Sequence, residues 1–144
     1  MPNGKKANDP KTPYYVYEFS FNNKVFYVGH TYHPDRSGGR WGWVKNVLRL
    51  EKSGKIPPRK LRDLNTPSNR VIAELIKAGL HEHVVTKCRP CLGKKQSRVE
   101  EEKQIRKRLS EGCVLSNRMH NPESPTVAQI LKYLGVAVAD RKRS

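Results

Sequence analysis

Residues 14–29 of this chain read YYVYEFSFNNKVFYVG, and this stretch decides how the chain folds. Aromatic and β-branched residues dominate on both sides of Asn22–Asn23, which is the composition of strands, and a pair of asparagines is typical of a turn. The stretch therefore predicts an antiparallel β-hairpin with strands over residues 14–21 and 24–30.

The length of the hairpin loop decides which side chains share a face of the sheet. A two-residue loop would place Tyr17 and Tyr27 on opposite faces, because side chains alternate along each strand. A shared face needs an odd loop, so we predict a three-residue loop, Phe21-Asn22-Asn23, with Asn23 in the left-handed conformation. Gly29 is expected at the strand end, where the absence of a side chain lets a phosphate or a backbone segment approach.

The rest of the chain predicts an α/β domain of the α+β type, with a small, mainly antiparallel three-stranded sheet flanked by helices and an extra C-terminal helix. We expect a flexible basic arm over residues 1–12, the compact domain over 13–121, and the C-terminal helix with a basic tail over 122–144. The expected elements are a helix from Arg40 through Leu48, a helical turn around Leu61 and Leu64, a helix over Val71–Ile76 that ends at Gly79, a strand over His83–Lys87, a helix from a Ser97–Glu100 capping box to Gly112, and a helix from Ser124-Pro125 to Leu134.

The chain is strongly cationic. Its 144 residues include 29 Lys and Arg against 13 Asp and Glu, a formal net charge of +16. Charge of this size indicates a polyanionic partner, and we expect nucleic acid rather than a membrane surface. No apolar run is long enough to span a bilayer, and no signal-peptide core is present.

Cysteine usage favours a reducing, cytoplasmic compartment. Three cysteines are an odd number, which argues against a disulfide framework. Cys88 and Cys91 have the spacing of a zinc knuckle, but the second pair that a zinc site normally needs is missing. Two incidental thiols at a strand end are therefore the favoured interpretation, with zinc as the alternative.

The order of several short motifs resembles that of the GIY-YIG nuclease superfamily, over roughly residues 14–118. Tyr15-Val16-Tyr17 occupies the place of the first motif, with Tyr15 in place of its glycine, and Tyr27-Val28-Gly29 matches the second. An arginine near a helix start, a glutamate in a later helix and an asparagine beyond it complete the pattern. The resemblance implies a metal-dependent endonuclease that hydrolyses phosphodiester bonds of nucleic acid, most simply double-stranded DNA.

The resemblance assigns the role of general base to Tyr17 and the positioning of water or phosphate to Tyr27. A tyrosine can act as a base only if its pKa falls well below about 10. His30, which stands where many members have lysine, would donate to phosphate or assist Tyr17. Without the other motifs, both tyrosines would be interpreted as ordinary strand aromatics.

Two arginines, Arg36 and Arg40, are candidates for the phosphate clamp. We prefer Arg40, because a helix start supplies backbone N–H groups and a favourable dipole, and because a helical arginine is better preorganised than one in a loop. The guanidinium fork suits bidentate contact with phosphate.

Glu101 is the predicted metal ligand. Glu100 is explained by the capping box, and Glu102 has Arg106 four residues on, which is typical of a solvated pair. Glu101 instead shares its helix face with apolar Ile105, so it is expected to point inward. A single carboxylate suffices for Mg²⁺ (or Mn²⁺), since phosphate and water complete its coordination.

Asn117 matches the terminal asparagine of the family, where it would be a structural and phosphate-side hydrogen-bonding group, and an Asx turn is the equal alternative. No separate recognition motif is apparent, so specificity is expected from a homodimer, the connector 53–67 or a partner protein. The basic segments 55–62 and 87–95 would contact phosphates without reading sequence. The rival function is a non-catalytic nucleic-acid-binding module on the same scaffold.

Overall fold

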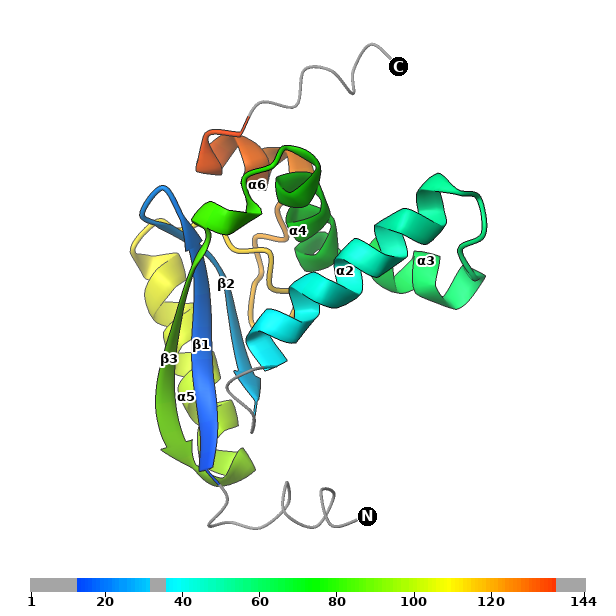
Figure 1. The fold of residues 1–144 in the computed structure, drawn as a ribbon. Coiled ribbons are helices and arrows are strands. Elements are labelled where there is room, and N and C mark those ends of the chain that lie inside the picture. Colours follow the sequence, from blue (N-terminus) through cyan, green and yellow to red (C-terminus); the bar gives the residue numbers. More distant parts are fainter. Residues whose placement is uncertain (1–12, 32–35, 137–144) are drawn as a thin grey trace.

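Strands β1 (Pro13–Phe21) and β2 (Lys24–Thr31) form the predicted hairpin, and β3 (Val85–Leu92) pairs with the other side of β1 (Figure 1). The computed structural model of the chain describes residues 13–31 and 36–136, without the side chains of 36–39. The strand order is β2-β1-β3, and both pairings are antiparallel. The predicted three-stranded antiparallel sheet is therefore confirmed.

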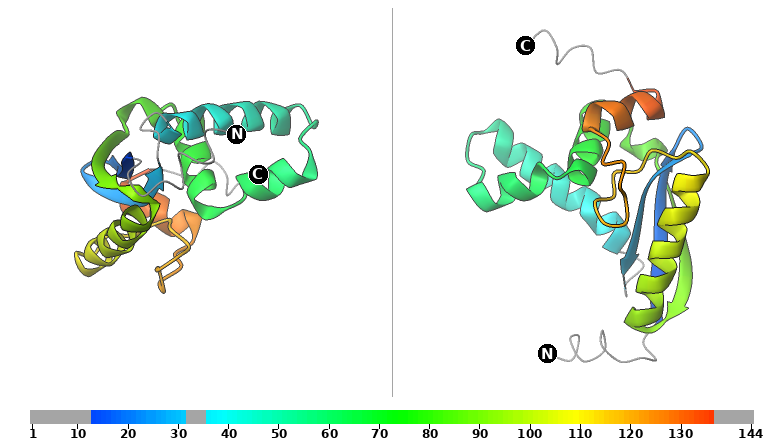
Figure 2. Two further views of the ribbon diagram at one scale, coloured as in Figure 1. Left: turned by 90° about the horizontal axis from the view of Figure 1, so that it is seen from below. Right: turned by 180° about the vertical axis from the view of Figure 1, so that it is seen from behind.

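Helices cover both faces of the sheet (Figures 1 and 2). One face carries α5, and the other carries α2, α4 and α6, so the molecule has the predicted α+β architecture. The helices are α2 (Arg36–Lys52), α3 (Pro58–Leu64), α4 (Pro67–Lys77), α5 (Gly93–Ser110) and α6 (Val127–Leu134), with a 3₁₀ turn at His81–His83. No helix among the described residues is both long and apolar enough to cross a membrane.

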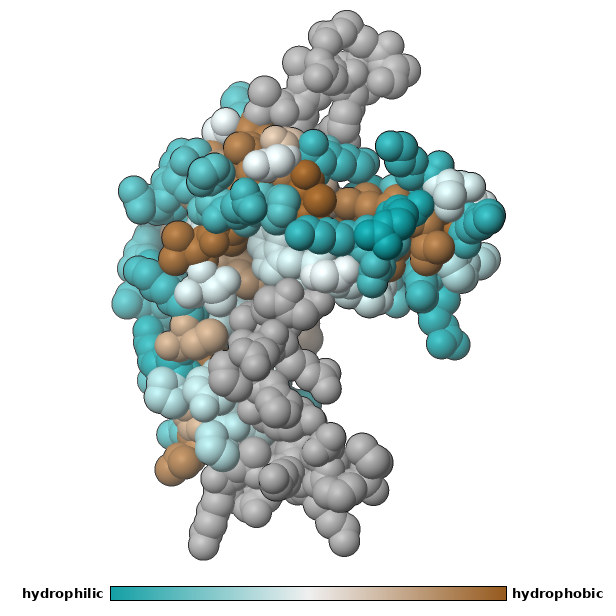
Figure 3. All heavy atoms as spheres, in the orientation of Figure 1, coloured by the Kyte–Doolittle hydropathy of each residue, from teal (hydrophilic) through white to brown (hydrophobic). Residues whose placement is uncertain are grey.

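The outer half of α2 and the short α3 stand away from the sheet as an arm (Figures 1 and 2). The space-filling view in Figure 3 shows that hydrophilic residues predominate at its outer end. Inside the arm, Leu64 is fully buried, and an ion pair of 2.7 Å between Arg70 and Glu51 ties α2 to α4.

Each face of the sheet buries its own apolar core. On the α2, α4 and α6 side, Phe19 and Phe26 pack with side chains such as Val44 and Leu131. On the α5 side, Val16 and Val28 pack with Ile105 and Leu115. Phe19 and Val16 follow the alternation of side chains along β1, whereas Phe26 and Val28 are two residues apart on β2 and yet face opposite cores. The register of the hairpin therefore matters for every residue of the site.

Several element boundaries differ from the prediction. Helix α2 begins at Arg36, and α5 begins at Gly93, so Ser97 lies inside a helix and its Oγ donates to the carbonyl of Lys94 instead of capping. The capping box of the structure is at α6, where Thr126 and Gln129 bond each other reciprocally.

The predicted three-residue loop is wrong, because the hairpin turns over two residues. Phe21 pairs with Lys24, and both Asn22 and Asn23 have positive φ angles, of 52° and 62°. Two consecutive left-handed residues define a type I′ turn, whose twist matches that of the flanking strands. By itself, this turn would put the tyrosines of the two motifs on opposite faces.

A β-bulge in β2 restores the shared face. Ser20 pairs with Val25, but the next pair is Phe19 with Tyr27, so Phe26 is an extra residue without a partner on β1. A bulge of this kind shifts the register by one residue beyond it. The tyrosines of the two motifs therefore lie on the same face of the sheet, although for a different reason from the predicted one.

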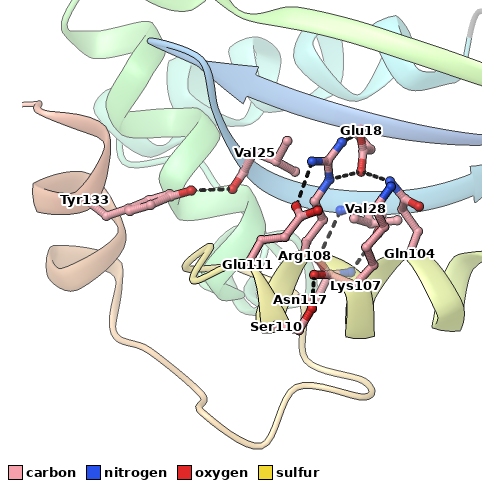
Figure 4. A network of polar contacts seen from close by, with 10 residues as sticks. All are labelled: Glu18, Val25, Val28, Gln104, Lys107, Arg108, Ser110, Glu111, Asn117 and Tyr133. Carbon is pink, nitrogen blue, oxygen red and sulfur yellow. Dashed lines mark hydrogen bonds and ion pairs between the residues drawn. The ribbon is translucent and has the colours of Figure 1, made fainter.

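Residues 116 and 117 fasten the outer edge of β2. The backbone N and the Oγ of Ser116 both donate to the carbonyl of Phe26, at 2.7 and 2.9 Å. Oδ1 of Asn117 accepts from the N–H of Val28 at 3.0 Å, and its Nδ2 donates to the Val28 carbonyl at 2.6 Å (Figure 4). One short segment thus holds the bulge and the residue between Tyr27 and Gly29, and the side chain of Asn117 makes structural hydrogen bonds to β2.

We predict that Asn117→Ala lowers the free energy of unfolding by about 2 to 4 kcal/mol, because it leaves a buried N–H and a carbonyl of β2 without their partner. Chemical denaturation measures this, with Asn46→Ala as the control, since Asn46 is exposed on α2. Equal losses in the two variants would show that Asn117 does not hold the strand.

A buried carboxylate anchors α5 to the sheet. Glu18 is 7% exposed and accepts from Nε and Nη2 of Arg108, at 2.7 and 2.8 Å, and from Gln104 at 2.6 Å (Figure 4). Burial by itself would raise the pKa of Glu18, but the hydrogen bonds from Arg108 and Gln104 outweigh it and hold the pKa below its usual range. The charged form of Glu18 is therefore the one that stabilises the fold.

This network predicts a loss of stability in acid. Because the pKa of Glu18 is lower in the folded than in the unfolded chain, its contribution is present above the unfolded value, about 4.3, and disappears as the pH falls through the folded value. Denaturation of Glu18→Gln should show a flatter pH dependence than the wild type in this acidic range. The control is Glu123→Gln at an exposed position, and identical pH profiles for wild type and Glu18→Gln would contradict the account.

Candidate active site

Tyr17 lies across Gly29, its partner on the neighbouring strand. A Cβ atom at position 29 would lie 2.6 Å from both Cζ and Oη of Tyr17. The tyrosine is 7% exposed, and its ring centroid is 5.3 Å from that of Phe19 and 6.0 Å from that of Tyr27. The phenol ring of Tyr17, and not the expected phosphate or backbone segment, therefore occupies the space that a side chain at position 29 would need.

Arg40 is held over the ring of Tyr27 by two residues of α4. Its Nε donates to Oδ1 of Asn69, and its Nη2 donates to Oγ of Ser68, both at 3.0 Å. The guanidinium carbon lies 4.6 Å from the centroid of the Tyr27 ring. Two of the five guanidinium N–H groups are used in this way, so three are left for an anion.

Both candidate arginines belong to α2. The helix begins at Arg36, so Arg40 lies in its second turn, and the helix-start argument that favoured Arg40 applies to Arg36 instead. The side chain of Arg36 lies outside the part of the chain that the structure describes. What preorganises Arg40 is its contact with Ser68, Asn69 and Tyr27.

The environment of Tyr17 stabilises its neutral form. Burial raises the pKa of the Tyr17 hydroxyl well above its ordinary value, and the adjacent Tyr27 raises it further. The positive charge of Arg40 lowers this pKa, and the negative charge of Glu101 raises it, so both groups lie within electrostatic reach of the phenol. In the free protein, Tyr17 is therefore a protonated phenol at neutral pH.

Glu101 meets His30 at the α5 side of β2. Its Oε1 lies 3.1 Å from Nδ1 of His30, at an angle that does not make a hydrogen bond, and the two side chains are 20% and 25% exposed. The ring of His30 also lies beside that of Tyr14, with centroids 6.3 Å apart. Because His30 follows Gly29, it points to the opposite face from Tyr17, and the structure places it against Glu101 instead.

The neighbouring glutamates are paired along the helix. Glu102 lies 2.8 Å from Arg106, as predicted, and Glu100 lies 3.5 Å from Lys103. Among the described residues, no lysine or arginine lies within ion-pair distance of Glu101. Glu101 is thus the glutamate of this run without a lysine or arginine partner among the described residues.

The side chains around Glu101 supply few further metal ligands. Within residues 13–31 and 36–136, no three His, Cys, Asp or Glu side chains gather into a group that could hold a metal ion. Cys88 and Cys91 are three residues apart on β3, so they point to opposite faces of the sheet, and one is exposed while the other is buried. Any divalent ion at Glu101 would depend on phosphate and water for its other ligands.

Sequence reasoning missed Ser68 and Asn69, which orient Arg40. The predicted helix covers Val71–Ile76 and leaves residues 68–70 outside it, whereas α4 begins at Pro67. The sequence does contain a signal for the earlier start, because Pro67 is at the first helical position, where proline is favoured. The contact of these polar side chains with Arg40 depends on how α2 packs against α4. No local sequence pattern predicts this packing.

No protein-family model, curated protein or solved structure matches the chain.

The contact between Tyr17 and Gly29 predicts opposite effects for two glycine substitutions. Gly29→Ala should destabilise the protein by about 1 to 3 kcal/mol, because the buried ring of Tyr17 has nowhere to move. Gly42→Ala should raise stability by up to about 1 kcal/mol, since Gly42 lies in α2 with open space at its Cβ position. Thermal unfolding of both variants tests this, and a Gly29→Ala protein as stable as the wild type would contradict the described geometry.

Proposed function

We propose that this protein is a metal-dependent endonuclease of the GIY-YIG type, which hydrolyses phosphodiester bonds of DNA. The observation that carries the proposal is the cluster of Tyr17, Tyr27 and Arg40 on one face of the sheet, beside Gly29, where a Cβ atom would collide with the Tyr17 ring. The formal net charge of +16 supports a nucleic-acid substrate.

Arg40 is the phosphate clamp in this proposal. Its guanidinium is fixed by Asn69, Ser68 and the Tyr27 ring, and its unused N–H groups are available to two oxygens of one phosphate. A donor that is already oriented stabilises negative charge on the phosphate in the transition state without reorganising.

Glu101 is the residue that would hold a divalent cation. Its partly exposed carboxylate without a lysine or arginine partner fits Mg²⁺, which binds through one or two carboxylates together with phosphate and water. When bound, the ion supplies positive charge that polarises the phosphate and promotes ionisation of nearby acids. His30, in contact with Glu101, restricts where the carboxylate can point.

Tyr17 accepts the proton of the attacking water in this mechanism. The raised pKa of Tyr17 in the free protein opposes that role, whereas the positive charge of Arg40 lowers this pKa. The proposal therefore requires that Tyr17 becomes a competent base only when cation and substrate are present. When a phosphate is bound without the cation, Tyr17 is a hydrogen-bond donor to a phosphate oxygen.

The raised pKa of Tyr17 is also the observation that favours the second candidate, a nucleic-acid-binding module without catalysis. In that module, Arg40 and the neutral Tyr17 hydroxyl bind a phosphate, and no proton transfer follows. Turnover distinguishes the two functions.

We predict that the protein nicks supercoiled plasmid DNA in the presence of Mg²⁺ or Mn²⁺ and that chelation abolishes this activity. Tyr17→Phe should reduce the rate at least about 100-fold, the contribution typical of a general base, while DNA affinity is retained. Glu101→Gln should reduce it at least as much, because it removes the carboxylate that would hold the cation. Agarose-gel kinetics and fluorescence anisotropy give the two readouts.

The matched controls are Tyr133→Phe and Glu102→Gln. Tyr133 also has a pKa raised by burial but donates to the carbonyl of Val25, away from the cluster, and Glu102 is a half-exposed carboxylate on α5 beside Glu101. Both control variants should nick at the wild-type rate. DNA binding without nicking over several divalent metals would overturn the enzymatic proposal in favour of the binding module.

A further inference from the structure

The arm, defined as residues 45–64, has far more positive than negative charge. It contains seven lysines and arginines, against Glu51 and Asp63. All seven cations are exposed, and none forms an ion pair with a described residue, whereas Glu51 is neutralised by Arg70. The seven are Lys45, Arg49, Lys52, Lys55, Arg59, Lys60 and Arg62.

The cations of α2 lie on one side of the helix. Lys45, Arg49 and Lys52 are spaced by four and three residues, which places them in one solvent-facing stripe. The opposite side of α2 carries Arg40 and Glu51, which bond to α4. The stripe continues into Lys55 after the helix, and α3 adds its own cations beside it.

The arm is a firm support for these charges. Leu64 is fully buried, Ile56 packs against the core, and the Glu51–Arg70 pair ties α2 to α4. At about 1.5 Å per residue, the stripe extends from about 8 to about 18 Å beyond Arg40 along the helix axis. At about 3.4 Å per phosphate of one strand, these distances correspond to roughly two to five phosphates from the one at Arg40.

We infer that the arm is a docking surface for double-stranded DNA. The arm contacts the DNA backbone several phosphates away from the phosphate held at Arg40. The inference rests on the proposed function for its assumption that Arg40 holds a phosphate of the same polymer. Charge complementarity favours a polyanion, and evenly spaced charges on a firm support match a rigid duplex.

The composition of the arm argues against a single-stranded partner. Proteins bind single strands by stacking bases on aromatic side chains, and no aromatic residue occurs between residues 45 and 64. The nearby Trp41 and Trp43 are partly buried and pack against the core instead of forming an exposed platform for bases. A helix also fits the wide major groove of B-form DNA, whereas the major groove of double-stranded RNA is too narrow for one.

The test is binding of a labelled 30-base-pair DNA duplex, measured by fluorescence anisotropy with chelator present, so that no cleavage is needed. The arm variant is Arg49→Gln with Lys52→Gln and Lys55→Gln. The control variant, Arg98→Gln with Lys107→Gln and Lys132→Gln, removes the same charge from exposed positions on α5 and α6. The arm variant should lose at least tenfold in affinity near 0.15 M salt, and the control variant less than threefold.

The salt dependence gives a second readout. Each lost phosphate contact reduces the slope of log affinity against log salt by about 0.9, so the arm variant should lose about 2 to 3 from the slope. Lysine-to-arginine changes at positions 52 and 55, which keep the charge, should leave binding unchanged and show that packing is not the cause.

Equal losses in the arm and control variants would overturn the inference, because they would indicate diffuse attraction only. Equal or tighter wild-type binding of single-stranded DNA or double-stranded RNA would overturn it as well. Because the assay requires no catalysis, an inactive protein that binds through the arm would refute the nuclease proposal and leave this inference standing.

Discussion

The bulge at Phe26, fastened by Ser116 and Asn117, is the constraint on which the candidate site depends. With the type I′ turn alone, the register of the hairpin would place Tyr17 and Tyr27 on opposite faces of the sheet. One extra residue in β2 reverses this, and it persists because the freed carbonyl of Phe26 has two donors from Ser116. A buried segment almost ninety residues away in sequence therefore determines which face of the hairpin carries the tyrosines.

The corrected register makes the rest of the cluster possible. It sets Tyr17 over Gly29, so that the ring of the first motif fills the space left open by the glycine of the second. It also presents the face of Tyr27 to Arg40, which is aimed by side chains from the first turn of α4. On the opposite face, the same alternation turns His30 toward Glu101. The end of β2 thus lies between Arg40 on one face and Glu101 on the other.

Sequence patterns predicted the elements that depend on neighbouring residues. They failed for features that depend on contacts between distant segments of the chain. The hairpin, the three strands and the stripe that forms α4 follow from periodicity and turn residues. No glycine or proline in β2 marks the position of the bulge at Phe26. The bulge is stabilised instead by hydrogen bonds from Ser116, which is distant in sequence. The inward direction of Glu101 was readable from its spacing to Ile105, but its meeting with His30 was not, because it depends on how α5 crosses β2. The raised pKa of Tyr17 likewise follows from burial among side chains of several elements.

The register of the hairpin is the most direct test of this account, and two-dimensional NMR measures it. Because the N–H and carbonyl of Val28 bond to Asn117, they point away from β1, and Glu18 and Val28 form a pair whose α-protons face each other. We predict a strong nuclear Overhauser effect between these two α-protons. A strong effect between the α-protons of Glu18 and Tyr27 instead would indicate a hairpin without the bulge, with Tyr17 and Tyr27 on opposite faces, and would contradict the account.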